Sequence, residues 1–333
     1  MVIGWYVHHH GYGHVARFLA VQPHLREKVR AFSSLPRPNG LGDDVEWIVL
    51  PHDADAIEYE DGTVFDPGTA DPTVRGALHW APHDHPGHRA RLTLLARSAA
   101  DLRAIVVDVS AEVVAFARLL GLRTLAVTQP GERTDAAHAL AYDLADRILA
   151  PWAHGAVPPG ALTTRTDRVV WTGGISRYDG RTPEEGDAER SVLFLGQVLA
   201  DDVRRDAEDR LSAAGWRTRA IGHDASSRLD DPWPLLTSHT VVVSAAGQNS
   251  VADLAAAGAR AVVVAQDRPF DEQRHTACAL HRWGLARVAP DDIDAEGIVA
   301  LVEAAATDDP DWSRWQVTGA AERAAEAIEA MLP

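Results

Sequence analysis

Short runs of apolar residues alternate with amphipathic segments along most of this chain, a pattern that predicts alternating strands and helices. The clearest example lies late in the chain, where residues 241–244 and 261–265 are two short, β-branched apolar runs. Between them, residues 251–257 fit a helix that ends at Gly258, after a turn of small and helix-capping residues at 245–250. We therefore expect a β-turn-α-β unit whose helix begins just beyond the carboxyl end of a buried strand.

The N-terminal part of the chain follows the same pattern. Residues 2–7 predict a strand, residues 8–13 a tight turn with two glycines, and a helix begins near His14. Further strands and helices follow up to residue 150, and a second alternating series begins at Ser191. The sequence therefore predicts an α/β protein of two similar halves, and its length of 333 residues is enough for two domains of ordinary size.

Composition narrows the range of partners. The formal net charge is −16, which argues against a nucleic-acid partner and against adhesion to an anionic membrane through bulk charge. The single cysteine, Cys278, allows no internal disulfide, and no signal peptide or membrane-spanning run is visible. We expect a cytoplasmic protein without a transmembrane segment; peripheral membrane contact and the oligomeric state stay open.

The turn before the helix at 251–257 suits an anion. The first N–H groups of a helix have no partner within it, the helix dipole makes that end positive, and small residues such as Gly247 allow a phosphate to come close. Asp253, one turn into the helix, is placed to accept a hydrogen bond from a ribose, and Glu272 and Gln273 follow the next strand on the same edge of the sheet. The alternative is an ordinary α/β unit with capped helices and a solvated acidic loop.

His14 is a candidate general base. It falls in the first turn of a helix that points into the cleft over the strand ends, where the helix dipole disfavours the imidazolium form. Asp108 ends a neighbouring buried strand and would orient the imidazole and stabilise its protonated form. The alternatives are that His14 only caps or packs, and that Asp108 or Ser110 only caps the helix predicted at 111–120.

A third group of histidines has a spacing that zinc sites use. His83, His85 and His88 could ligate a metal, but the segment lacks the aspartate that metallo-β-lactamase-type sites place before the last histidine, and it contains Pro86 and Gly87. We interpret it as a loop and expect no metal site.

The motifs at both ends of the chain resemble those of GT-B glycosyltransferases, and most closely glycosyltransferase family 28, which includes the N-acetylglucosaminyltransferase of peptidoglycan synthesis. The resemblance covers roughly 40 residues around 241–277 and returns in the loop at 11–17. It implies a role for each matching residue: diphosphate binding by Gly247, Gln248, Asn249 and Ser250; ribose binding by Asp253, where the family usually has Glu; donor-sugar binding by Glu272 and Gln273; proton abstraction by His14; and cleft loops at Gly11, Gly13, Arg17, Gly196 and Gln197.

The same resemblance implies two Rossmann-like domains that face a cleft. We expect an acceptor domain at residues 1–172, a linker at 173–190, a nucleotide-sugar domain at 191–311, and a C-terminal helix at 312–333 that packs back on the first domain. The implied activity is metal-independent transfer of a sugar from a nucleotide diphosphate sugar, with uridine as the expected base, to an acceptor hydroxyl with inversion. The nucleotide sugar is a co-substrate, and no other cofactor is expected. A nucleotide-sugar hydrolase, an epimerase and a non-catalytic sensor remain as alternatives.

Overall fold

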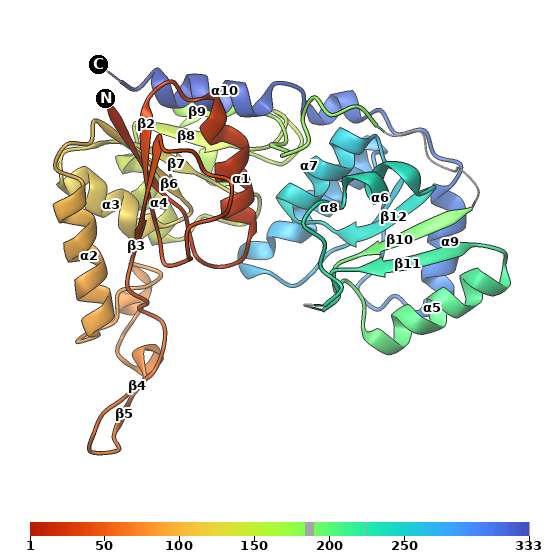
Figure 1. Ribbon diagram of the computed structural model, residues 1–333, viewed down its shortest axis with the longest axis horizontal. Helices are drawn as coiled ribbons and strands as arrows, with labels where there is room; N and C mark the ends of the chain where they lie inside the picture. The colour runs from red at the N-terminus through yellow and green to blue at the C-terminus, as the bar shows by residue number, and fades with distance from the viewer. Residues whose placement is uncertain (184–189, 225, 333) are drawn as a thin grey trace.

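Two parallel sheets, one after the other along the chain, form the framework of the structure, a computed structural model that describes residues 1–183, 190–224 and 226–332 (Figure 1). In this described part the first sheet has seven strands, in the order β3-β2-β1-β6-β7-β8-β9, and the second has five, in the order β11-β10-β12-β13-β14. All neighbouring strands within these two sheets are parallel. The fold class predicted from the sequence, α/β with two Rossmann-like domains, is confirmed.

The strands of the first sheet are β1 (Val2–Tyr6), β2 (Lys28–Ser33), β3 (Val45–Val49), β6 (Ala104–Asp108), β7 (Arg123–Val127), β8 (Arg147–Ala150) and β9 (Val169–Trp171). Those of the second are β10 (Ser191–Leu195), β11 (Arg217–Ile221), β12 (Val241–Ala245), β13 (Ala261–Val264) and β14 (Arg287–Val288). The helices are α1 (Gly13–Val21), α2 (Pro86–Ser98), α3 (Ala111–Leu119), α4 (Ala136–Leu144), α5 (Asp201–Ala213), α6 (Trp233–Ser238), α7 (Gln248–Ala257), α8 (Glu272–Trp283), α9 (Ala295–Ala305) and α10 (Ala320–Glu329).

The cores explain why these segments form strands. Central strands such as β6 are buried along their whole length, because helices cover both faces of a parallel sheet. On one face of the first sheet, Trp5 packs edge-on against Phe18 of α1, with ring centroids 5.2 Å apart. The same apolar cluster includes Ala324 and Ile328, so α10 buries its small-residue face on the first sheet (Figure 1).

The strand order creates a switch point in each sheet, and both switch points lie where ligands bind in open α/β sheets. In the first sheet the chain runs outward from β1 to β3 and then returns to place β6 on the other side of β1. In the second sheet it runs from β10 to β11 and returns to place β12 beside β10. His14 lies at the start of the helix after β1, Asp108 is the last residue of β6, and Gly247 lies in the loop after β12, so the topology gathers these residues at the two switch points.

The C-terminal segment differs from the single helix predicted over residues 312–332. A short 3₁₀ turn, Trp312–Trp315, is separated from α10 by a bend in which Gln316 and Gly319 adopt left-handed backbone conformations. The bend is needed because the segment leaves one half of the molecule for the other. The Trp312 indole donates to the carbonyl of Ala259 beside the second sheet, whereas α10 lies against the first.

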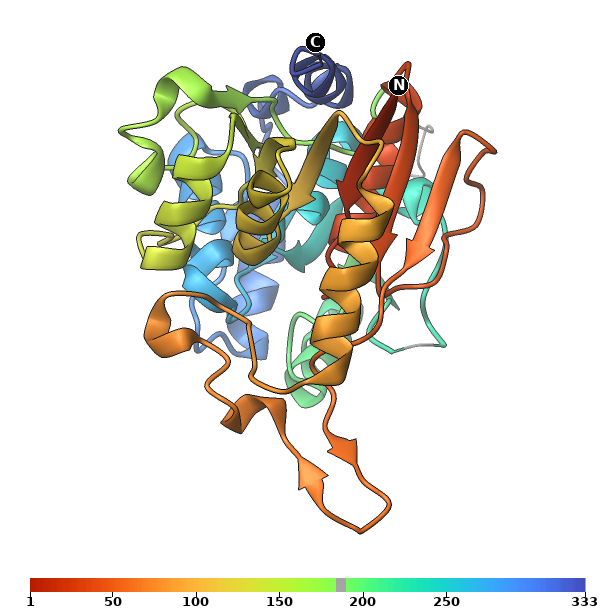
Figure 2. The ribbon, with the colours of Figure 1, turned by 90° about the vertical axis from the view of Figure 1, so that its left-hand side faces the viewer.

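An arm projects from the first half, where the sequence predicted a loop over residues 53–72. Within it, β4 (Ile57–Glu58) and β5 (Val64–Phe65) pair as a short antiparallel hairpin that extends away from the body of the molecule (Figures 1 and 2). After the arm, the chain returns to the body of the molecule at residues 79–88. This segment lies at the edge of the cleft described below.

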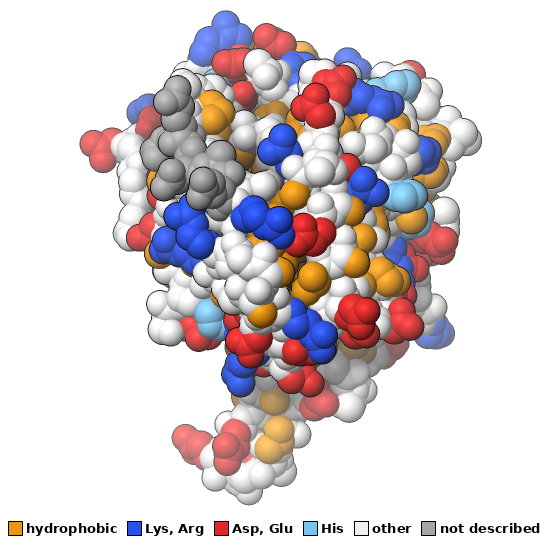
Figure 3. All heavy atoms as spheres, turned by 90° about the vertical axis from the view of Figure 1, so that its right-hand side faces the viewer, with side chains coloured by type: hydrophobic (Ala, Val, Ile, Leu, Met, Phe, Trp, Pro, Cys, Tyr) orange, Lys and Arg blue, Asp and Glu red, His pale blue; other side chains and the backbone are white. Residues whose placement is uncertain are grey.

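The outer face of the second half carries basic and acidic side chains side by side (Figure 3). Across the described residues, the structure contains no helix that combines the length and apolar character needed to cross a bilayer.

Candidate active site

A cavity of about 720 Å³ lies between the two halves of the molecule. The first half contributes the loop after β1 and the start of α1, and the second contributes the starts of α7 and α8. Ten of the residues predicted from the sequence line it: Gly11, Gly13, His14, Arg17, Gly247, Gln248, Asn249, Ser250, Glu272 and Gln273. The structure thus brings together two motifs that are more than 200 residues apart in the sequence.

His14 and Asp108 lie in direct contact, as the sequence predicted. The distance between His14 Nδ1 and Asp108 Oδ1 is 3.0 Å, and Asp108 is completely buried behind the histidine. Burial pushes the pKa of Asp108 upward, but the charge of Arg17 and the contact with His14 outweigh it, so the pKa lies below its ordinary value. An ionised Asp108 accepts a hydrogen bond from Nδ1–H, which leaves the lone pair of the imidazole on Nε2. Asp108 does not cap α3; that hydrogen bond is made by Ser110, which accepts from Val113 N–H.

Arg17 joins this pair to the other half of the molecule. Its Nη1 lies 2.6 Å from Asp108 Oδ1, and its Nη2 donates to Gln248 Oε1 at 2.9 Å. The guanidinium is buried, as are its two partners. Within the described residues, Arg17 Nε, Asp108 Oδ2 and Gln248 Nε2 are buried polar atoms without a hydrogen-bond partner. Three such atoms in one place form a polar cluster that the described side chains alone do not satisfy, although buried polar groups are normally paired.

The start of α7 is open. Among the described residues no side chain caps this helix, and its first turn contains no acidic residue. Its N-cap, Gly247, has an ordinary extended backbone with φ of −69°, so glycine is not needed here for its conformation. Asn249 points across the cleft and donates to the carbonyl of Gly13 at 2.6 Å. The free N–H groups and the helix dipole make this end of α7 suitable for an anion.

Glu272 and Gln273 begin α8 on the same side of the cavity. Gln273 Oε1 accepts hydrogen bonds from two backbone N–H groups, those of Ala246 and Gln266, and so ties together the loops that follow β12 and β13. This leaves the amide nitrogen of Gln273 for a ligand. Burial raises the pKa of Glu272, while the charge of Arg133, 3.8 Å away, acts in the opposite direction.

Four predicted residues do not line the cavity: Asp108, which is buried behind His14, and Gly196, Gln197 and Asp253. Gly196 and Gln197 follow β10, and Gln197 is exposed. Asp253 accepts a hydrogen bond from Ser176 at 2.7 Å and lies 3.8 Å from Arg177, both in the segment that links the two sheets. Burial raises the pKa of Asp253 to about 6, against the effect of these two partners. Its predicted role with a ribose therefore stays a prediction.

The histidines with zinc-like spacing do not form a common site in the described structure. His85 caps α2 through its Nδ1, His88 contacts Asp53, and His83 is exposed. Instead, a different group of side chains could hold a metal ion among the described residues. It consists of His79, Asp135 and His138, of which the two histidines line the cavity.

This second group is held together by its own hydrogen bonds. Asp135 contacts both imidazoles, and Arg133 donates to the remaining ring nitrogen of His138 at 3.1 Å. Burial, aided by the neighbouring cation Arg133, lowers the pKa of His138 to about 4, so the ring is neutral at pH 7. A guanidinium at this position would repel a metal ion, and the hydrogen bonds satisfy the group without one.

Some features of the cavity were not found from the sequence. Phe270 reaches across from the second half, edge-on to His138 and beneath the guanidinium of Arg133, and its carbonyl accepts from Glu132 N–H. Phe270 and Val109, both at the cavity, have positive φ angles of 63°. Strained backbone of this kind gathers at ligand sites, but only the folded structure reveals it.

Comparison with known proteins identifies the class of fold. Residues 228–329 match the family profile described as the glycosyltransferase family 28 C-terminal domain. Among curated protein sequences, none matches this chain significantly.

Three solved structures are similar over almost the whole chain. A glycotransferase of kitacinnamycin has a TM-score of 0.69 at 16% identity, covering 100% of this chain and 99% of its own. Acinetobacter baumannii MurG has a TM-score of 0.62 at 16% identity, covering 99% of each chain. The calicheamicin glycosyltransferase CalG4 has a TM-score of 0.63 at 15% identity, covering 99% of this chain and 98% of its own. The fold is therefore that of a GT-B protein. Together with the profile match, these findings support a glycosyltransferase and confirm the resemblance to family 28 predicted from the sequence.

Proposed function

We propose that this protein transfers a sugar from a nucleotide diphosphate sugar to a hydroxyl group of an acceptor. The observation that carries the proposal is the uncapped start of α7 inside the cavity, next to the buried and unpaired amide nitrogen of Gln248. In the proposed complex, residues 247–250 hold the diphosphate, Asp253 holds the ribose, and Glu272 and Gln273 hold the sugar. The choice of uridine as the base rests on the resemblance to family 28 alone.

The proposed reaction is a direct displacement. His14 Nε2 takes the proton of the acceptor hydroxyl, the acceptor oxygen forms a bond to the anomeric carbon, and the bond from that carbon to the diphosphate oxygen breaks. Asp108 holds the imidazole through Nδ1 and balances its charge when it is protonated. Attack on the face opposite the leaving group inverts the anomeric configuration.

The departing diphosphate needs positive charge, and the cavity supplies it. The N–H groups of α7 face it from one side, and Arg17, Arg133 and Arg268 line the same space. Such groups stabilise the leaving group without a metal ion, so we propose a metal-independent reaction.

The proposal is tested by calorimetric titration of UDP, dTDP, GDP and ADP in the presence of EDTA, followed by turnover of the corresponding sugar nucleotides. UDP should bind and raise the melting temperature, because a ligand that binds only the folded state stabilises it. Absence of binding by every nucleoside diphosphate, or binding that requires Mg²⁺, would contradict the proposal. Free sugar released without an acceptor would identify a hydrolase, an isomerised donor an epimerase, and binding without turnover a sensor.

A further inference from the structure

A second cavity of about 380 Å³ opens from the first, within the N-terminal half of the molecule. The two cavities share His8, His10, His79 and Val109, so they meet beside the reactive histidine, and the rings of His8 and His14 lie 5.5 Å apart. A molecule held in the second cavity can therefore extend a group toward His14. The volume is at the lower end of the range for small-molecule sites.

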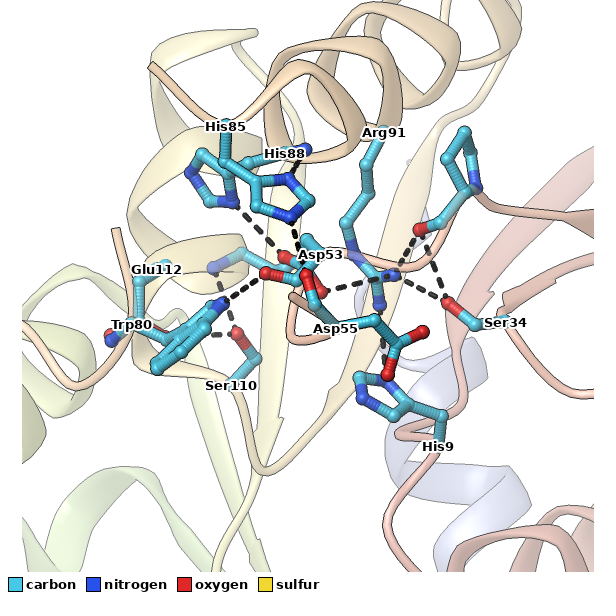
Figure 4. A network of polar contacts seen from close by, with 12 residues as sticks. His9, Ser34, Asp53, Asp55, Trp80, His85, His88, Arg91, Ser110 and Glu112 are labelled. Atoms are coloured by element: carbon cyan, nitrogen blue, oxygen red, sulfur yellow. Dashed lines mark hydrogen bonds and ion pairs between the residues drawn. The ribbon is translucent and has the colours of Figure 1, made fainter. Parts of the chain in front are cut away.

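The polar side chains of this second cavity are already paired with one another (Figure 4). Arg91 points from α2 into the centre of the network, where it donates to the hydroxyls of Ser34 and Tyr6 and lies 3.7 Å from Asp53. The other oxygen of Asp53 contacts His88 Nδ1 at 3.0 Å.

Glu112 is engaged in the same way. Its carboxylate accepts from the backbone N–H groups of His79 and Trp80 and from the hydroxyl of Ser110. The charged side chains of the second cavity thus bond to one another or to the backbone, and much of the remaining polar lining consists of histidine rings. A sugar, which carries hydroxyls on every side, is poorly matched to such a lining.

The cavity also lacks a free cation. Among the described residues that line the cavity, Arg91 is the single arginine and there is no lysine. The carboxylate of Asp53 balances the charge of Arg91. Burial holds the pKa of His8 well below its ordinary value, and burial with the nearby charge of Arg91 lowers that of His9 to about 4. These two imidazoles are neutral at pH 7, so neither compensates the charge of a phosphate.

The walls that remain are rings and apolar side chains. Trp80 is fixed by a hydrogen bond from its indole to the carbonyl of Asp53, and the rings of His8 and His9 are stacked 4.9 Å apart at the opening. Leu92 of α2 and Val113 of α3 complete the apolar lining. Flat rings of this kind favour a flat, uncharged ligand.

We infer that this second cavity binds an uncharged aromatic aglycone, whose hydroxyl group reaches through the opening at His8 and His10 to His14. The role of this compound as the acceptor rests on the proposed function, but its binding does not. Two other acceptor classes fit this lining less well: a saccharide, which needs many hydrogen-bond partners, and an anionic lipid, which needs a free cation, whereas Arg91 is paired with Asp53.

The test is equilibrium binding to the full chain, without any nucleotide, of three flat phenols: 2-naphthol, 7-hydroxycoumarin and 4-phenylphenol. Methyl β-glucoside and geranyl phosphate serve as the saccharide and anionic probes. Ala54→Trp and Leu92→Trp place a bulky side chain into the cavity from residues that are not fully buried. Ala90→Trp and Leu119→Trp make the same changes at exposed sites outside it.

At least one phenol should bind, and both cavity variants should weaken its binding at least tenfold, while the two control variants should not. UDP affinity should stay unchanged in all four variants, so a failure of the proposed function would appear in the UDP titration and not in the phenol titration. Binding by none of the phenols, equal binding in cavity and control variants, or tighter binding of methyl β-glucoside or geranyl phosphate would overturn the inference.

Discussion

The two sides of the main cavity are built in opposite ways. On the N-terminal side the reactive groups are bonded to each other: Asp108 contacts both His14 and Arg17, and all three are buried. On the C-terminal side the start of α7 leaves its N–H groups without a side-chain partner among the described residues. The N-terminal side is therefore a preassembled hydrogen-bond network, whereas the C-terminal side presents free backbone N–H groups that can bind an anion.

An open start is not unique to α7, because among the described helices α1, α5, α6, α8 and α10 also begin without a side-chain cap. The starts of α1, α7 and α8 line the main cavity. Elsewhere, His85, Asp135 and Asp294 accept from the first N–H groups of α2, α4 and α9. Such a cap typically contributes about 1 kcal/mol, so a helix that forgoes it at a cavity gives up stability that a bound anion would restore. We expect chemistry to depend on the N-terminal side and donor affinity on the C-terminal side.

The largest effect should come from His14→Ala. A general base contributes about two to four orders of magnitude in rate, so turnover of the sugar nucleotide should fall by about 100- to 10,000-fold. His24→Ala, which removes a partly exposed imidazole, is the control and should retain wild-type turnover. Steady-state rates of nucleotide release measure both variants. Full activity in His14→Ala would remove this residue as the base.

The next effect concerns the start of α7. Gly247→Asp places a carboxylate where the diphosphate is expected, so UDP binding should weaken by at least about 100-fold through repulsion. Gly247→Ala is the matched control, because a Cβ here meets only the Gln273 amide nitrogen at 3.6 Å and φ is not positive. Calorimetric titration of UDP into both variants separates the effect of the negative charge from the steric effect of a side chain. Equal affinity in the aspartate and alanine variants would place the diphosphate elsewhere.

A smaller effect should distinguish sugar from nucleotide. Glu272→Gln removes the charge of a partly buried acceptor, and loss of such a partner costs about 1–3 kcal/mol. The affinity for the sugar nucleotide should fall about tenfold, while that for UDP stays constant. Asp271→Asn, at the exposed neighbouring position, should change neither affinity. If Glu272→Gln weakened both ligands equally, Glu272 would be contacting the nucleotide.

The smallest effect is on stability and follows from Asp253. Its pKa of about 6 in the folded state exceeds that of an unfolded aspartate, so its stabilising contribution is complete below about pH 4 and is lost as the pH rises through 6. Asp253→Asn should therefore match the wild type near pH 4 and exceed its unfolding free energy by about 1–3 kcal/mol at pH 7. Denaturant unfolding at both pH values measures this difference. A constant difference between the two would contradict a raised pKa.

The sequence was sufficient where local pattern and topology agree. The contact between His14 and Asp108 was predictable because both follow buried parallel strands, whose carboxyl ends meet at one edge of the sheet. The turn at 245–250 was predictable because small residues lie between an apolar run and a helix.

The rest depends on contacts between segments far apart in the chain. The sequence placed Arg17 at the cleft, but its two partners were not predictable, because only the docking of α7 against α1 buries it between Asp108 and Gln248. The same holds for Phe270, whose ring packs on His138 of the other half, and for the second cavity around Arg91, which five separate segments enclose. No periodicity encodes such long-range packing.

One measurement tests the division of labour between the two sides most directly: calorimetric titration of UDP into His14→Ala and Gly247→Asp side by side, in EDTA, with single-turnover rates recorded at saturating sugar nucleotide. The account predicts that His14→Ala binds UDP as tightly as the wild type yet reacts at least about 100-fold more slowly, whereas Gly247→Asp fails to bind. Normal UDP binding by Gly247→Asp together with loss of binding by His14→Ala would contradict it.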